Sequence, residues 1–575
     1  MNAMTFDMAF ARSRIRLVDI RHRQLLTAQL RMLLLAGGFA LIAFVALIRI
    51  AWLGVVQPAP TEHSMAQALL PSRGEITDRN GVPLARAFPA YALWYNPQAL
   101  EDGGPPLVNP PAIVAARLKA IFPDMDLAET TRFLAAAKPG YLRRRVLPGE
   151  VNAVNAIGEL ALETPGEADR QYPQGKLAAH VLGYVASDGH GRVGMESFLD
   201  KRLLDPAERG QPVPLSIDVR VQGALEDELA SGMRAVEAVG AAGIVLDVDT
   251  GEVLALASLP SFDPNKIDAE GQQRMFNRVT NEVYELGSTF KPLTVAAAID
   301  AGVITDLGKR YPAAPLHVDG FTIHDDENLG SSLNIPETLI HSSNIVSAQI
   351  AAQLGGDRLS RALSDLGMSE RPYIELPARG FPIWHKAPWP RLRTMTVGFG
   401  HGVAVTPLHL AAAYAALVNG GIWRPATLLK VKPGEEARGR RVFKASTSAR
   451  MNQLLRMITV YGTGRKANAP GFRVGGKTGS AEKAGAGGYQ KHSIVATFAS
   501  AFPMDRPRYV VIAMLDEPKA VAASSFQRTA AWNAVPIVGR LIPRIGPMLG
   551  VLPDDNRDID LSDLKPLVGD GGGNE

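Results

Sequence analysis

The most continuous apolar pattern in the chain lies near its N-terminus. Residues 32–48 carry no charged side chain, and the apolar run resumes after Arg49 over residues 50–56. Together they exceed the roughly 20 residues that a helix needs to cross hydrocarbon, and an arginine near a helix end can extend to the interface. Arginines outnumber acidic residues over residues 1–31. The pattern therefore predicts a cytoplasmic basic segment followed by a single uncleaved transmembrane anchor at 32–56.

Beyond the anchor, strand-like and helical periods alternate without any concentration of reactive side chains. Residues 90–95 are typical of a strand, and amphipathic helices are expected around residues 111–137 and 150–163. Residues 57–61 are rich in proline and are typical of a linker. We therefore predict that residues 57–215 form a non-catalytic pedestal domain.

A second region with mixed strand and helix patterns extends over residues 216–545. Two strand-length apolar runs flank a turn and predict a hairpin at 243–257, and further strands are expected at 493–498 and 509–514. The end of the chain, residues 546–575, becomes acidic and Gly-rich, which predicts a disordered tail.

Composition excludes several classes of protein. The chain has 575 residues, a net charge of +4 and no cysteine, so disulfides, thiol nucleophiles and cysteine-based metal sites are excluded. It contains no zinc-finger spacing, no Walker loop and no dinucleotide-binding glycine pattern. A small net charge on a chain of this length gives no support for a nucleic-acid partner, and we expect none.

The most informative polar pattern is Ser288 followed three positions later by Lys291. Residues three apart on a helix share a face, so the amine would lie beside the hydroxyl, and a serine nucleophile needs such a base. A turn at 286–287 and the apolar run 293–299 predict a helix beginning at Ser288, with free backbone N–H groups directed at a developing oxyanion. Taken alone, so short a pattern more often marks a helix cap and a solvated lysine.

Two further polar motifs follow it along the chain. Ser342 and Asn344 precede an apolar run at 345–352, where they could relay a proton and bind a peptide group, although helix capping is their more frequent role. Lys477 and Thr478 follow a strand-like segment, and an ammonium beside a hydroxyl makes a suitable carboxylate site.

The two lysines are expected to differ in charge. Burial and a second nearby cation both lower the pKa of a lysine. We therefore expect Lys291 to be the neutral base and Lys477 to be the charged group that faces the substrate.

The three motifs, in this order, form the set found in penicillin-binding proteins and serine β-lactamases. The chain resembles class B penicillin-binding proteins, which are peptidoglycan D,D-transpeptidases, and among them the cell-division FtsI type. The resemblance covers almost the whole chain. Further segments that carry it are RGEITDRNG at 73–81, RQYP at 170–173, AHVLG at 179–183, GRVGME at 191–196, SIDVRVQ at 216–222 and GFGHG at 398–402.

The resemblance implies an α+β multidomain fold: a single N-terminal transmembrane helix, a mixed α/β pedestal and a serine β-lactamase/transpeptidase-like domain. That domain, at 216–545, would be an antiparallel sheet with surrounding helices. The resemblance also implies that Ser288 is the acylated nucleophile and Lys291 its base. Ser342 and Asn344 would assist proton transfer and bind the donor peptide.

The same resemblance assigns the substrate side of the site. Lys477 and Thr478 would hold the terminal carboxylate of D-Ala-D-Ala or of a β-lactam. Backbone N–H groups of Ser288 and Ser480 would form the oxyanion hole, and Gly479 would belong to the same substrate-binding segment as Lys477, Thr478 and Ser480. Residues 484–489 are expected to form a mobile loop that could gate the cleft. The acidic loop at 324–328 could suggest a metal, but a solvated loop is favoured, and no cofactor or metal is expected.

The expected partners are peptidoglycan stem peptides or lipid-linked precursor strands, β-lactams, an FtsW-type glycosyltransferase and other divisome proteins. The implied location is the bacterial cytoplasmic membrane, with the catalytic domain in the periplasm. Three alternatives stay open: an elongation-type transpeptidase, a β-lactamase, and a β-lactam sensor or divisome scaffold. A β-lactamase would need a means to activate water, and a sensor would place several spans ahead of its domain. A pure scaffold would be free to lose Ser288.

Overall fold

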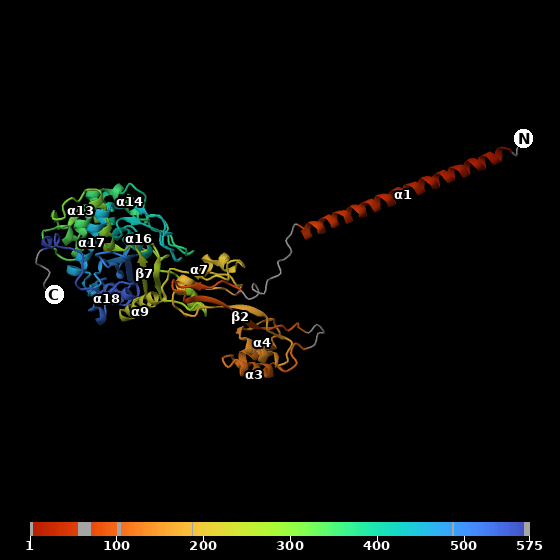
Figure 1. The fold of residues 1–575 in the computed structure, drawn as a ribbon, viewed down its shortest axis with the longest axis horizontal. Helices are drawn as coiled ribbons and strands as arrows, with labels where there is room; N and C mark the ends of the chain where they lie inside the picture. The colour runs from red at the N-terminus through yellow and green to blue at the C-terminus, as the bar shows by residue number, and fades with distance from the viewer. Residues whose placement is uncertain (1–3, 56–70, 100–104, 187, 486–487, 569–575) are drawn as a thin grey trace. The chain divides into compact units, whose positions relative to one another are not determined.

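The computed structural model of the chain describes residues 4–55, 71–99, 105–186, 188–485 and 488–568. It contains two compact units, Met1–Leu70 and Pro71–Glu575. In the first unit, helix α1 extends over Met4–Val55 (Figure 1). Its stretch Leu25–Arg49 is long and apolar enough to cross a membrane, with a mean hydropathy of 2.3. The predicted linker at 57–61 lies outside the described residues.

The first part of the second unit is a mixed sheet with helices packed on it. The long strand β2 pairs with β1, β3, β4 and β5, and β1 also pairs in parallel with β6. The strands are β1 (Ile76–Thr77), β2 (Pro83–Tyr95), β3 (Gly140–Val146), β4 (Leu162–Glu163), β5 (Gly166–Gln171) and β6 (Val213–Pro214). The helices are α3 (Pro111–Ile121), α4 (Leu127–Ala135), α5 (Pro148–Asn155), α6 (Ala179–Leu182), α7 (Gly194–Phe198) and α8 (Asp200–Leu204).

Two of the expected helices have different limits in the structure. The predicted helix at 111–137 is divided into α3 and α4. The helix predicted over 150–163 is wrong beyond Asn155, where α5 ends. Gly158 has a φ of +78°, a left-handed conformation that glycine adopts readily and that terminates a helix.

A buried ion cluster joins segments of the pedestal that are distant in sequence. Glu196, which is inaccessible to solvent, accepts from Arg73 Nε at 2.8 Å and from Arg170 Nε at 2.6 Å. Arg73 also donates to Asp200 at 2.8 Å. Removing one member of such a cluster leaves a buried charge unpaired, which is strongly destabilising.

The remainder of the second unit is built on an antiparallel sheet in the order β15-β16-β17-β7-β8. Its strands are β7 (Gly240–Asp247), β8 (Val253–Leu259), β15 (Gly475–Gly485), β16 (Gly488–Phe502) and β17 (Tyr509–Asp516). Helices α9 (Val219–Ala235) and α18 (Ala534–Met548) cover one face, and α11 (Lys291–Asp300), α16 (Pro407–Val418) and α17 (Ala445–Tyr461) cover the other. The predicted hairpin and strands are therefore present, and the predicted fold class is confirmed.

The sheet is buried on both faces because alternate side chains enter different cores. Ile244 and Ile512 belong to the core shared with α11, α16 and α17, whereas Val245 and Val511 belong to the core shared with α9 and α18. Successive side chains of a strand point to opposite faces, so the unbroken apolar runs in β7 and β17 follow directly from this burial. Strand β15 is an edge of this sheet and, among the described residues, pairs with β16 alone.

The predicted disordered tail at 546–575 is wrong for residues 546–568. Helix α18 continues to Met548, and the chain then packs along α17, with Leu561 and Leu564 buried in the core. Arg456 of α17 holds Asp558 through three contacts of 2.6–3.0 Å. Acidic side chains that indicate disorder by composition are here paired with arginines of the domain. Residues 569–575 lie outside the described residues.

Candidate active site

Ser288 lies in a tight turn that precedes α11. The turn is a 3₁₀ helix, η1 (Gly287–Phe290), and the α-helix begins only at Lys291, so the predicted helix start at Ser288 is three residues early. Pro292 explains the position, because proline is accommodated in the first turn of a helix. Ser288 is partly exposed, whereas the two residues after it are buried. The turn thus presents the serine hydroxyl on an otherwise packed element.

The nucleophile turn is fixed by contacts on several sides. Gly287 has a φ of +52°, and a Cβ there would lie 3.2 Å from the Ser480 carbonyl oxygen on β15. Tyr414 of α16 donates its hydroxyl to the Thr289 carbonyl at 2.8 Å. A Cβ at Gly400 would lie 2.0 Å from the Gly287 carbonyl oxygen, so the 398–402 segment packs directly against the turn. These contacts hold Ser288 rigidly beside the edge strand.

Ser342 joins the two lysines of the site. Its Oγ lies 3.1 Å from Lys291 Nζ and 2.9 Å from Lys477 Nζ. Lys291 also donates to the Ser342 carbonyl, and Ser342 has a φ of +64°, an unfavourable conformation for a side chain larger than glycine. Such backbone conformations cluster at functional sites, where surrounding contacts hold them in place.

Both lysines are fully buried, and this burial controls their charge. Burial lowers the pKa of Lys291 to about 7, partly offset by the charges of Asp325 and Asp326. Burial lowers the pKa of Lys477 well below its usual range, and the charge of Lys291 lowers it further. Two adjacent ammonium groups disfavour each other, so the pair holds one proton more readily than two. An anionic ligand beside Lys477 would favour its charged form.

Ser343 and Asn344 begin helix α13 (Asn344–Leu354). Ser343 caps the helix by accepting from the Val346 N–H at 3.2 Å. Asn344 donates its side-chain amide to the His324 carbonyl at 3.1 Å. The capping function expected of this motif therefore belongs to Ser343. Ser342 contacts the two lysines, and the Asn344 side chain contacts the acidic loop at His324.

Asp325 is a further residue of the site whose role the sequence did not reveal. Its carboxylate accepts from Ser343 Oγ at 2.7 Å, from the Ile345 N–H at 3.1 Å and from the Asn344 N–H. A carboxylate at a helix N-terminus is stabilised by the free N–H groups there. The acidic loop at 324–328 is therefore a support for the Ser342–Asn344 motif. Asp325 lies 19 residues before Asn344, so no local pattern in the sequence indicated this contact.

Strand β15 contributes Lys477, Thr478 and Ser480 to the candidate site. Lys477 also contacts the Thr478 hydroxyl at 3.2 Å, and that hydroxyl lies 2.8 Å from the hydroxyl of Thr463, a second residue that the sequence did not reveal. A Cβ at Gly479 would lie 2.4 Å from the Leu286 carbonyl oxygen, so only glycine permits this approach of strand and turn. Ser480 is exposed at the strand edge.

The structure thus brings the predicted residues to one place from three segments of the chain. Lys291, Ser342, Lys477 and Thr478 form one connected polar network, and the turn that carries Ser288 packs against β15, where a Cβ at Gly287 would lie 3.2 Å from the Ser480 carbonyl oxygen. A hydroxyl nucleophile, an amine poised near neutral pKa and a carboxylate-binding group are the components of acyl transfer through a covalent serine intermediate. Side chains of residues 484–492, where the gating loop was predicted, lie outside the described part of the chain.

Two known protein families match most of the chain. The family described as "Penicillin binding protein transpeptidase domain" matches residues 241–536, and "Penicillin-binding Protein dimerisation domain" matches residues 68–203. Among curated proteins, the chain is 37% identical over 533 residues to a "Probable peptidoglycan D,D-transpeptidase FtsI" of Caulobacter vibrioides, covering 91% of this chain and 89% of that one. It is 30% identical over 525 residues to the "Peptidoglycan D,D-transpeptidase FtsI" of Escherichia coli, covering 85% and 88%.

The fold is shared with solved structures as well. Penicillin binding protein 3 of Mycobacterium tuberculosis, complexed with aztreonam, superposes with a TM-score of 0.65 at 24% identity. The match covers 85% of this chain and 99% of that chain. At this identity the match establishes the fold.

Proposed function

Since this chain belongs to the penicillin-binding proteins of the FtsI type, with their dimerisation and transpeptidase domains, we propose that Ser288 carries a peptidoglycan D,D-transpeptidase reaction. The observation that supports this most directly is the Ser342 hydroxyl, placed 3.1 Å from Lys291 and 2.9 Å from Lys477 beside the nucleophile turn. One lysine can then serve as base while the other binds a carboxylate.

Acylation begins with attack of Ser288 Oγ on the carbonyl carbon of the penultimate D-Ala. Lys291, with its pKa lowered to about 7, accepts the hydroxyl proton. The new Ser288 Oγ–C bond replaces the D-Ala–D-Ala amide bond, and the leaving amine takes a proton through Ser342. An acceptor amine then attacks the ester, forms the cross-link and releases Ser288.

The substrate carboxylate is the group that gives Lys477 its charge. In the free site, burial and Lys291 hold the pKa of Lys477 well below its usual range. A bound carboxylate provides an opposite charge, which raises that pKa and strengthens the contact. Lys477 and Thr478 hold this carboxylate, while the backbone N–H groups of Ser288 and Ser480 stabilise the oxyanion and Asn344 binds the donor peptide.

We extend the proposal to the setting of the enzyme. The apolar stretch Leu25–Arg49 anchors the chain in the inner membrane as a single span, with the arginine-rich N-terminus cytoplasmic and the catalytic domain periplasmic. The relatives named FtsI support a role in septal wall synthesis during cell division. An FtsW-type glycosyltransferase is the expected partner.

The test is the mass of the intact full-length protein after incubation with a penicillin, followed by peptide mapping and a time course. We expect one stable adduct on Ser288 that persists for many minutes, and none in Ser288→Ala at an unchanged melting temperature. Rapid return to the unmodified mass with hydrolysed drug would instead show a β-lactamase. Labelling of another residue would overturn the assignment of the nucleophile.

A further inference from the structure

A pocket lies in the unit Pro71–Glu575, and none of its lining residues belongs to the candidate catalytic site. Its volume is about 220 Å³, and it is enclosed by the C-terminal end of α14 (Gly356–Asp365), the loop that follows, α16, and strands β13 (Ile422–Trp423) and β14 (Arg440–Arg441). A cavity of ~150 Å³ suffices to hold benzene. The pocket therefore has room for a ring and one polar substituent.

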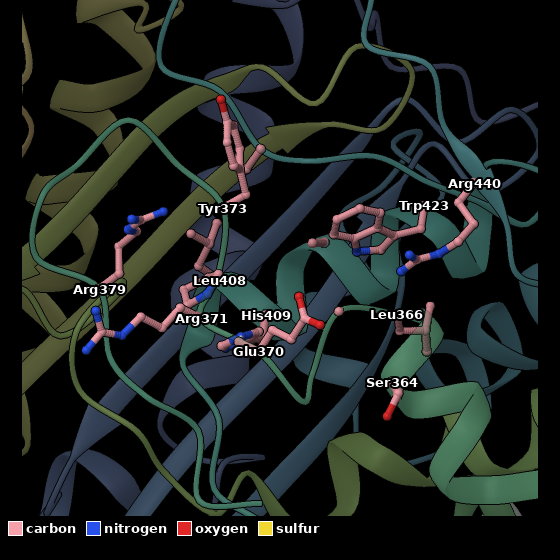
Figure 2. Close-up of a pocket in the computed structure, with 14 residues that line it drawn as sticks. Ser364, Leu366, Glu370, Arg371, Tyr373, Arg379, Leu408, His409, Trp423 and Arg440 are labelled. Atoms are coloured by element: carbon pink, nitrogen blue, oxygen red, sulfur yellow. The ribbon is translucent and has the colours of Figure 1, made fainter.

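One end of the pocket is cationic. Figure 2 shows Arg371 and Arg379 at the same end of the cavity, both from the loop after α14. Among the described residues, neither guanidinium forms an ion pair with a carboxylate, and Arg379 Nε is buried without a hydrogen-bond partner. A buried donor on a charged group is costly when unpaired, so Arg379 has unused capacity for an anion. Arg371 is exposed and lies 5.3 Å from the Phe381 ring centre, and its guanidinium N–H groups can still donate to a carboxylate.

The other end of the pocket is apolar and aromatic. Trp423 lies at the end away from Arg371 and Arg379 (Figure 2), and Leu366 and Leu408 also line the pocket. Arg440 at this end is already engaged, because it lies 4.9 Å from the Trp423 ring centre and donates Nε to the Asp365 carbonyl at 3.1 Å. This end can therefore receive a hydrophobic body.

The floor of the pocket contributes no further charge. His409 of α16 accepts from the Thr406 N–H through Nδ1 at 3.1 Å, and its Nε2 donates to the Glu370 carbonyl at 2.8 Å. Both ring nitrogens are thus satisfied in the neutral form, and burial lowers the His409 pKa to about 4. Glu370 is the one carboxylate that lines the pocket, and it is exposed to solvent.

We propose that this pocket is a binding site for a small monocarboxylate with an aromatic or similarly apolar body. The carboxylate is held by Arg371 and Arg379, and the body lies over Leu408 toward Trp423. Three arginines against a single exposed carboxylate favour an anion, and the volume limits the ligand to about the size of a substituted benzene ring.

The test uses the full-length protein in a neutral detergent and three probes of equal size: benzoate, benzamide and benzylammonium. Binding is measured by ligand-observed NMR and by calorimetry. We expect saturable binding of benzoate, binding of benzamide that is at least about ten-fold weaker, and none of benzylammonium, because a charge-assisted hydrogen bond is worth about one order of magnitude in Kd.

Two matched variants give opposite predictions. Arg379→Met should weaken benzoate binding at least about ten-fold, whereas Glu370→Gln removes the one negative charge and should strengthen it. Both variants should keep the wild-type rate of penicillin acylation, which shows that the fold and the catalytic site are intact. Equal binding of benzoate and benzamide, equal affinity in wild type and Arg379→Met, or no saturable benzoate binding would each overturn the proposal.

Discussion

Replacing Asp325 with asparagine separates the two effects that this side chain has on the catalytic site. The carboxylate accepts from Ser343 Oγ at 2.7 Å, from the Ile345 N–H at 3.1 Å and from the Asn344 N–H. Asparagine keeps the volume, but it has no charge and only one accepting oxygen. The loss of one charge-assisted hydrogen bond and of the favourable interaction with the helix N-terminus should lower the free energy of unfolding by about 2 kcal/mol.

The kinetic consequence has two components with different pH behaviour. Acylation requires neutral Lys291, so its rate should rise with pH through the pKa of about 7. Asp325 raises that pKa, and its neutralisation should therefore move the rise to lower pH. The plateau rate should fall about ten-fold or more, because Asn344 loses the contacts that position it, and small displacements of a substrate-binding group are costly.

The assay is the second-order rate of acylation by a fluorescent penicillin from about pH 5.5 to 9, together with urea unfolding. Asp326→Asn is the matched control, since the charge of Asp326 also raises the Lys291 pKa but its carboxylate is not the one that holds the start of α13. It should move the rise without lowering the plateau. An Asp325→Asn protein with an unchanged plateau and stability, or with a rise at higher pH, would refute this account of the site.

Three further outcomes follow from the same contacts. Lys477→Ala should slow acylation by carboxylate-bearing β-lactams about 10- to 100-fold, because it removes a charge-assisted contact, and equal rates would remove Lys477 from the site. Folding lowers the pKa of Lys291 from 10.5 to about 7, so between these pH values the unfolded chain binds a proton that the folded protein does not. The free energy of unfolding should therefore rise with pH over this range, and urea unfolding measures that rise. Arg456→Met should lower stability by about 2 kcal/mol, because it removes the buried guanidinium's hydrogen bonds to the Val474 carbonyl and the Asn468 side chain. Asp558→Asn should cost less because Asp558 is half-exposed; thermal melts compare the two.

The sequence predicted which polar groups lie together around Ser342, because each is tied to a short motif with its own chemistry. The spacing of Ser288 and Lys291 predicted an amine near a hydroxyl, and the strand carrying Lys477 was recognisable from its apolar flanks. The sequence could not show that the Ser342 hydroxyl would lie between both lysines, because that contact joins segments more than a hundred residues apart. The local start of the helix was also misjudged, since a 3₁₀ turn and an α-helical turn share the same residue preferences.

Amino-acid composition predicted local structure less well where contacts between residues distant in sequence determine that structure. Residues 554–568 are acidic enough to predict disorder, yet Asp558 pairs with Arg456, and Asp563 pairs with Arg450. The loop at 324–328 was interpreted as solvated, but Asp325 is turned inward to the start of α13. Thr463 and Tyr414 belong to no motif, and only the fold brings them to Thr478 and to the nucleophile turn.

The docked C-terminal segment has a consequence for the order in which the enzyme matures. Arg456 connects Asp558 to the Val474 carbonyl at the base of β15, and β7 pairs with β17 across more than two hundred and fifty residues. Domains fold progressively from the N-terminus during synthesis. The strand that carries Lys477 therefore acquires its final support only after almost the entire chain has been made. A partly synthesised protein contains the nucleophile but no complete site, and activity is delayed until the last fifteen or so residues of the described chain have docked.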